Sequence, residues 1–120
     1  MKKFVVTAAL SAALSAQINP AGAVVNVAVA VPGSFAAGYA TPQLVLSKSA
    51  PATLINLDIE PHDIRSTLKR PDDKLWFKSD VIGTGETAEI EGLATTPNGE
   101  YEFFCVVHAS TMRGTATVVD

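Results

Sequence analysis

The chain has 120 residues, which is enough for one ordinary domain. Nine basic residues stand against 12 acidic ones, a formal net charge of −3 at pH 7, and this balance excludes the basic footprint of a nucleic-acid-binding protein. The single cysteine excludes an internal disulfide, so in an exported protein its thiol would be buried and inert, paired between chains or bound to a metal.

The N-terminus has the pattern of a secretory signal peptide. Two lysines follow Met1, and an apolar run of about 13 residues extends from Phe4 to Ala16, shorter than the roughly 20 residues of a membrane span. Small residues in AGA, residues 21–23, then provide a cleavage site. We expect residues 1–23 to be removed on export to the periplasm or medium, without stable membrane insertion. A cut near Ala16 and a buried N-terminal helix are the alternatives.

The remaining chain, residues 24–120, has the two-residue period of β-strands. Short apolar or alternating runs are separated by Gly, Pro, Asn and Asp, and no segment carries a helical stripe. The longest irregular connection runs from Pro32 to Pro42. We expect a monomeric all-β domain, a Greek-key β-sandwich or barrel of seven to eight strands. The expected strands lie near residues 24–31, 43–48, 52–58, 62–67, 74–79, 86–92, 100–105 and 114–119.

The run KLWFKS, residues 74–79, contains the only tryptophan. In a strand, Trp76 and Phe77 would face opposite sides because successive side chains alternate. We expect Trp76 to be the one that faces the core.

The strand that ends at Cys105 has a clear inner face. Alternation in EYEFFC places Tyr101, Phe103 and Cys105 on one side. The other side carries two glutamates and Phe104, and glutamates mark a face exposed to solvent. Cys105 is therefore predicted to point inward at the end of its strand. Taken alone, it could equally be a small buried hydrophobe.

The two histidines of the chain and one of its methionines change that interpretation. His108 and Met112 follow Cys105 closely, and His62 lies after a proline in EPHDI. Two imidazoles, a thiolate and a weaker thioether are the ligand set of a blue-copper electron-transfer site. Zinc has little use for a thioether. A cysteine–histidine hydrolase would need a substrate cleft that so small a β domain hardly leaves room for.

These residues make the chain resemble the cupredoxins, the small blue-copper proteins of the plastocyanin, amicyanin and pseudoazurin kind. The resemblance runs from about residue 43 to 119 and is strongest in EPHDI, FKSDVIGTGETAEIEGL and GEYEFFCVVHASTMRGTATV. Tyr101, four residues before the cysteine, and Gly114, two after the methionine, also fit the family pattern. The resemblance implies one copper ion in a type 1 site. Its ligands would be His62, Cys105, His108 and Met112.

Two features depart from the family pattern. Plastocyanins place four residues between the loop histidine and the methionine and amicyanins two, whereas this chain has three, AST, which leaves the axial contact length open. Both groups usually carry proline before that histidine, whereas this chain has Val107. Valine keeps a backbone N–H that can reach the Cys105 sulfur, as can the N–H of Asp63, and such donors tune a redox potential.

The resemblance implies an exported shuttle for single electrons, with redox partner proteins docking near His108. Such a protein would not be an enzyme, because four protein ligands leave no open position for substrate. A copper-binding protein that delivers or detoxifies Cu(I) is the alternative. A metal-free structural module is the third possibility.

Overall fold

The computed structural model describes residues 24–120, and the predicted signal peptide, residues 1–23, lies outside the described residues. Eight short strands make up most of the regular structure, together with one helical turn, α1 (Ser34–Ala37), and a 3₁₀ turn, η2 (Leu93–Thr95). The strands are β1 (Val24–Val25), β2 (Val27–Ala30), β3 (Gln43–Ser47), β4 (Thr53–Asn56), β5 (Arg65–Ser66), β6 (Thr87–Glu89), β7 (Gly99–Phe104) and β8 (Arg113–Val119). Within this part of the chain, no helix is long and apolar enough to cross a membrane.

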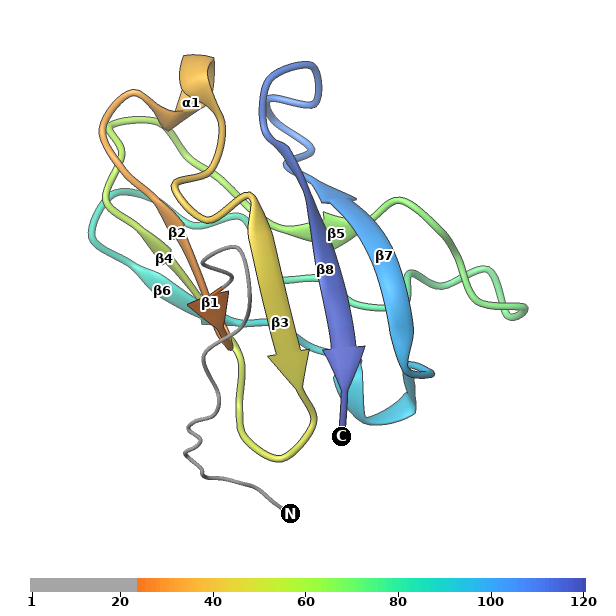
Figure 1. Ribbon diagram of the computed structural model, residues 1–120. Coiled ribbons are helices and arrows are strands. Elements are labelled where there is room, and N and C mark those ends of the chain that lie inside the picture. The colour runs from red at the N-terminus through yellow and green to blue at the C-terminus, as the bar shows by residue number, and fades with distance from the viewer. Residues whose placement is uncertain (1–23) are drawn as a thin grey trace.

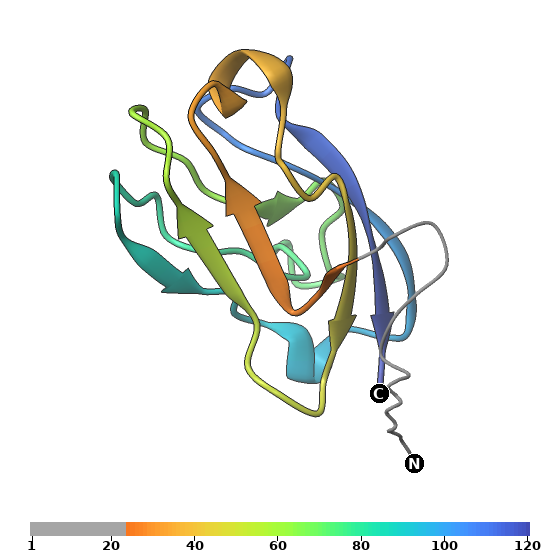
Figure 2. The same ribbon diagram turned by 60° about the vertical axis from the view of Figure 1, so that its left-hand side comes forward.

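The strands form two sheets that face each other, as Figures 1 and 2 show. One sheet has the order β1-β3-β8-β7-β5 and the other the order β2-β4-β6. In the larger sheet, β3 pairs with β8 in parallel, and β8 pairs with β7 antiparallel. The predicted all-β sandwich of seven to eight strands is confirmed.

Asn26 moves the chain from one sheet to the other. It lies between β1 and β2 with a positive φ of 59°, a left-handed conformation that asparagine tolerates better than most residues. Its side-chain oxygen accepts from the Ser47 N–H at 2.7 Å, and its amide nitrogen donates to the carbonyls of Ser47 and Ala50. These hydrogen bonds with the end of β3 therefore fix the bend at Asn26. On either side of the bend, β1 is an edge strand of the larger sheet and β2 an edge strand of the smaller one.

The inner faces of the two sheets make the core. Along β2 the buried residues are Ala28 and Ala30, whereas the valines of this run lie on the half-buried outer face. Along β7 the inner face carries Tyr101 and Phe103, as alternation predicted. The small alanines allow β2 to pack closely, and aromatic residues of the opposite sheet fill the space.

The predicted strand at residues 74–79 is wrong. This segment makes only isolated bridges, through Leu75 to Lys69 and through Lys78 to Arg65 and Glu91. The prediction for its aromatic pair is wrong as well, because Phe77 is buried and Trp76 is only partly buried. Trp76 packs edge-on against Tyr101 at 6.2 Å between ring centroids, on the rim of the core.

One end of the sandwich gathers the segments that carry the predicted ligands. The loop between β7 and β8 lies there beside α1, and the C-terminus lies at the opposite end (Figure 1). Thr111 in the β7–β8 loop donates its hydroxyl hydrogen to the Phe35 carbonyl of α1 at 2.6 Å. The fold therefore brings two segments far apart in the sequence to one end of the molecule.

Candidate metal centre

The β7–β8 loop holds three of the four predicted ligands in one tight turn. Cys105 follows the last residue of β7, and Met112 precedes the first residue of β8. The loop closes where the Cys105 N–H donates to the Met112 carbonyl at 3.0 Å. Inside it, the His108 N–H donates to the Cys105 carbonyl at 3.2 Å, and the Met112 N–H donates to the His108 carbonyl at 2.9 Å. Two adjacent antiparallel strands therefore present Cys105 and Met112 side by side.

His62 comes from a different part of the chain. A pair of backbone hydrogen bonds with Ile82, at 3.0 and 2.8 Å, fixes its main chain. Its Nδ1 atom lies 3.8 Å from the Cys105 sulfur, and the Nδ1 atom of His108 lies 3.9 Å from the same sulfur. All three ligand atoms lie within 4.8 Å of one another. The structure therefore brings His62 together with Cys105 and His108 of the β7–β8 loop, as the sequence predicted.

These distances fit three ligands of one metal ion. Metal–sulfur and metal–nitrogen bonds of about 2.3 and 2.1 Å, the values for zinc, place sulfur and nitrogen about 3.8 Å apart when they meet near 120°. The two observed sulfur–nitrogen separations, 3.8 and 3.9 Å, each agree with that value. Two imidazoles and one thiolate in a trigonal site are the donor set of type 1 copper.

Burial separates this centre from solvent. Cys105, His62 and Met112 are each fully buried, whereas the His108 side chain is 17% exposed. Burial raises the pKa of the Cys105 thiol, and hydrogen bonds from the backbone of Asp63, His108 and Val107 oppose that rise. The backbone groups of Asp63 and Val107, which the sequence singled out, are therefore among those that lower the pKa of this thiol. His108 is the one predicted ligand that reaches the surface.

Asp58, which the sequence interpretation did not single out, fixes the orientation of His62. Its Oδ2 atom lies 2.7 Å from His62 Nε2, and both side chains are fully buried. The carboxylate also accepts from the backbone N–H groups of Gly33, Phe35 and Ile59. Burial disfavours its charge, but these hydrogen bonds, the one with His62 first, lower its pKa to about 2. An ionised Asp58 holds the imidazole proton on Nε2, which leaves Nδ1 free to bind a metal.

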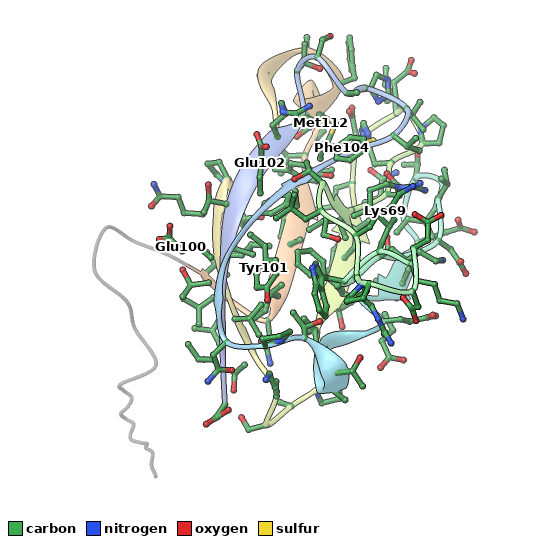
Figure 3. All side chains as sticks on the ribbon, turned by 90° about the vertical axis from the view of Figure 1, so that its right-hand side faces the viewer. Lys69, Glu100, Tyr101, Glu102, Phe104 and Met112 are labelled. Carbon is green, nitrogen blue, oxygen red and sulfur yellow. The ribbon has the colours of Figure 1, made fainter. Side chains whose placement is uncertain are left out.

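Met112, the fourth predicted ligand, lies at the end of the β7–β8 loop. It is fully buried, and its carbonyl pairs with the backbone of Cys105. Figure 3 places Met112 and Phe104 at the same end of the molecule. The outer face of Phe104 is covered by the Arg113 guanidinium, 5.4 Å from the ring centroid. Coordination by the Met112 sulfur stays a prediction.

Comparisons with known proteins place the chain in a family. A family profile described as copper-binding proteins of the plastocyanin/azurin family matches residues 25–119. The chain belongs to this family. A comparison with curated protein sequences found no match.

Solved structures of cupredoxins share the fold. A purple cupredoxin from Nitrosopumilus maritimus is 24% identical with a TM-score of 0.57, over 77% of this chain and 97% of that one. Amicyanin from Paracoccus versutus is 22% identical with a TM-score of 0.56, over 86% and 87%. A copper-containing nitrite reductase from Thermus scotoductus is 21% identical with a TM-score of 0.58, over 82% of this chain and 22% of that one. The cupredoxin fold therefore stands on its own in two of these proteins and is part of a larger chain in the third.

The Val107 donor leads to a prediction about the copper site. Val107→Pro removes the N–H that reaches the Cys105 sulfur and removes no predicted ligand. With one donor fewer, the thiolate carries more charge and favours Cu(II), so the reduction potential should fall. A hydrogen bond contributes about 0.5–1.5 kcal/mol. For a one-electron couple, about 59 mV corresponds to a tenfold change in the equilibrium constant. Voltammetry should therefore show a fall of tens of millivolts, with the blue colour retained.

The control for Val107→Pro is the structure of the loop. Val107 is 45% exposed, so the substitution takes little from the core, but proline also restricts the conformation of Val106. A crystal structure of the variant should show the ligand side chains unmoved. A potential that rises or stays constant with an unmoved loop would show that the Val107 donor has no effect on the copper site.

Proposed function

We propose that this protein is an exported carrier of single electrons, in which His62, Cys105, His108 and Met112 hold one copper ion. The observation that carries the proposal is the buried group of two imidazole nitrogens and one thiol sulfur within 4.8 Å. Membership of the copper-binding plastocyanin/azurin family supports the choice of metal. Bound copper would supply a one-electron couple, so that the centre could receive one electron from a reduced partner protein and pass it to an oxidised one, with no atom transferred.

The chain's own residues keep this centre in one arrangement. His62 is held at Nε2 by Asp58, and His108 is held by backbone hydrogen bonds on both sides of its loop. Because these contacts use atoms other than the proposed ligand atoms, the ligands need little movement when the charge of the ion changes. A cage that fits both oxidation states favours rapid electron exchange.

The same cage argues against an enzyme. Three of the four proposed ligands are fully buried, and four protein ligands leave no open position at which a substrate could bind. The copper-containing nitrite reductase among the structural neighbours has a much longer chain, of which this domain covers 22%. We therefore propose a carrier that exchanges electrons and performs no substrate chemistry.

His108 is the proposed route for electrons. Its exposed surroundings contain three apolar side chains, Phe35 at 37%, Val106 at 46% and Val107 at 45%, and the Glu60 carboxylate, 3.6 Å from His108 Nε2. The Phe35 ring centroid lies 6.3 Å from that of His108. Such a rim suits a small and weak contact with a redox partner protein, as electron-transfer encounters require.

A charged side chain in this rim should slow electron exchange. Ala109 is exposed and follows His108 directly. Ala109→Glu would place a carboxylate in the proposed contact, where docking would have to desolvate it, and we expect at least a tenfold lower bimolecular rate with the partner. Stopped-flow mixing with the physiological partner, or first with a small cytochrome, measures this rate. The absorption spectrum should be nearly unchanged.

The matched control for Ala109→Glu is Ala94→Glu. Ala94 is also exposed, and it lies in η2, outside the β7–β8 loop and α1. This variant changes the net charge equally and should exchange electrons at the wild-type rate. Equal rates in the two variants would place docking on another surface.

Metal analysis and redox cycling test the proposed function directly. Protein purified from copper-supplemented cells should contain one copper per chain, be intensely blue when oxidised and bleach reversibly on reduction. A colourless protein that transfers Cu(I) to an apo-acceptor would instead support the alternative of copper delivery or detoxification. A protein without copper under these conditions would support a structural module.

Export is the remaining part of the proposal. We infer that residues 1–23 are a secretory signal and that residues 24–120 are the working domain, which acts in the periplasm or medium as a monomer. N-terminal sequencing of the exported protein should begin at Val24. Size-exclusion chromatography with light scattering should give the mass of a single domain.

A further inference from the structure

A second buried carboxylate, Asp63, lies beside the candidate metal centre and is not among its ligands. Asp63 follows His62 and is fully buried. Its Oδ1 atom accepts from the Val106 N–H at 2.8 Å. Its Oδ2 atom lies 2.8 Å from Arg65 Nε and 2.7 Å from Arg65 Nη2. A carboxylate that accepts from one backbone N–H and from two nitrogens of its ionic partner is held firmly in place.

Asp63 connects the two segments that supply ligands. Its side chain accepts from the N–H of the residue directly after Cys105, its backbone lowers the pKa of the Cys105 thiol, and its carbonyl accepts from the buried Tyr39 hydroxyl. Arg65 is the cation of this group. It begins β5, where it pairs with Phe104 of β7, and its side chain is 27% exposed. Asp63 therefore joins the His62 segment to the Cys105 segment at two points and to Tyr39 at a third.

We propose that the Asp63–Arg65 ion pair is a positioning and charge-balancing device for the copper site, an inference that rests on the proposed function. Oxidised copper carries one more positive charge than reduced copper, so a nearby carboxylate favours the oxidised form and a nearby guanidinium favours the reduced form. In the pair the two effects oppose each other. Arg65 thereby allows a carboxylate to brace the ligand loop without a large fall in potential.

The proposal predicts opposite shifts for the two partners. Asp63→Asn keeps an oxygen for the Val106 N–H but removes the negative charge, so the potential should rise. Arg65→Gln leaves the buried carboxylate without its cation, so the potential should fall. We expect each variant to change the equilibrium constant with a reference couple by about tenfold, or about 59 mV. The double variant, which restores neutrality, should return close to wild type.

Two further variants separate this role from a purely structural one. Arg65→Lys keeps the charge and should keep the potential, and it protects the test if Arg65→Gln folds poorly, since breaking a buried pair is destabilising. Lys69→Gln removes one cation from the exposed Lys69–Asp73 pair and should leave the potential unchanged. Shifts of the same sign in Asp63→Asn and Arg65→Gln, or no shift in blue variants, would overturn the charge-balancing role.

The bracing role is tested without copper. Hydrogen exchange followed by NMR on the metal-free protein should show the Val106 amide protected in wild type and in Asp63→Asn. In Asp63→Ala, which removes the acceptor, exchange should be at least tenfold faster. Equal protection in Asp63→Ala would overturn the brace. Because this readout needs no metal, a failure of the proposed copper function would be recognised separately, as a protein that binds no copper while Val106 remains protected.

Discussion

Replacing Cys105 with serine is expected to abolish the blue colour of the copper-loaded protein. An alcohol stays protonated at neutral pH and is a poor copper ligand beside a thiolate, and the colour depends on the bond between thiolate and Cu(II). The variant should still fold, because serine is smaller than cysteine and its oxygen would meet the donors from Asp63, Val107 and His108 that now face the sulfur. Visible absorption after addition of Cu(II) measures the loss.

Ser110→Ala is the control for this substitution. Ser110 is exposed and lies in the same loop, so its removal should leave the colour intact. Thermal unfolding of the metal-free Cys105→Ser protein checks that the fold survives. A serine variant that remains blue would mean that Cys105 is not a copper ligand.

The sequence predicted the site well because its chemistry is local. Three of the four predicted ligands lie within eight residues, and the alternation of EYEFFC alone placed Cys105 on the inner face. His62 could be assigned because the described fold offers one other histidine. Residue type and strand period were therefore sufficient to identify the residues that the structure gathers around the Cys105 sulfur.

The residues that support these ligands could not be assigned from the sequence. Asp58 acts through backbone donors at Gly33, Phe35 and Ile59, and Asp63 acts through Val106 and Arg65. Most of these partners lie more than 20 residues away in the sequence, so no periodic pattern predicts the contacts. The usable signal was the presence of three acidic residues around His62, namely Asp58, Glu60 and Asp63, of which the structure buries the first and the last.

The error at residues 74–79 has a different cause. A strand pattern with a large aromatic residue suggested that Trp76 would be buried, because tryptophan has the larger apolar surface. The segment instead makes isolated β-bridges to several neighbours. Phe77 takes the core position beside Tyr101, with 6.0 Å between the ring centroids. The local sequence pattern cannot show which of two adjacent aromatic side chains faces the core.

Gly114→Ala is expected to destabilise the protein strongly. Gly114 lies opposite Phe103 in the β7–β8 pair. A Cβ atom there would lie 2.4 Å from Phe103 Cζ and 2.4 Å from the Pro42 carbonyl oxygen. Neither neighbour can move freely, because Phe103 is fully buried and the Pro42 carbonyl accepts from the Thr115 N–H at 2.9 Å. Overpacking costs about 1–3 kcal/mol or more, and we expect the upper part of that range.

Calorimetry of the metal-free protein measures the effect, and Gly83→Ala is its control. About 3 kcal/mol should lower the melting temperature by roughly 12 °C or more. At Gly83, which does not lie in the left-handed region, a Cβ atom would meet only the Glu86 side chain, at an ordinary 3.5 Å from Oε1. That variant should be neutral or slightly stabilised, because alanine restricts the unfolded chain. Similar melting temperatures for the two variants would show that β8 can shift away from Pro42. Its first residue follows Met112 directly, so that shift would also displace a proposed copper ligand.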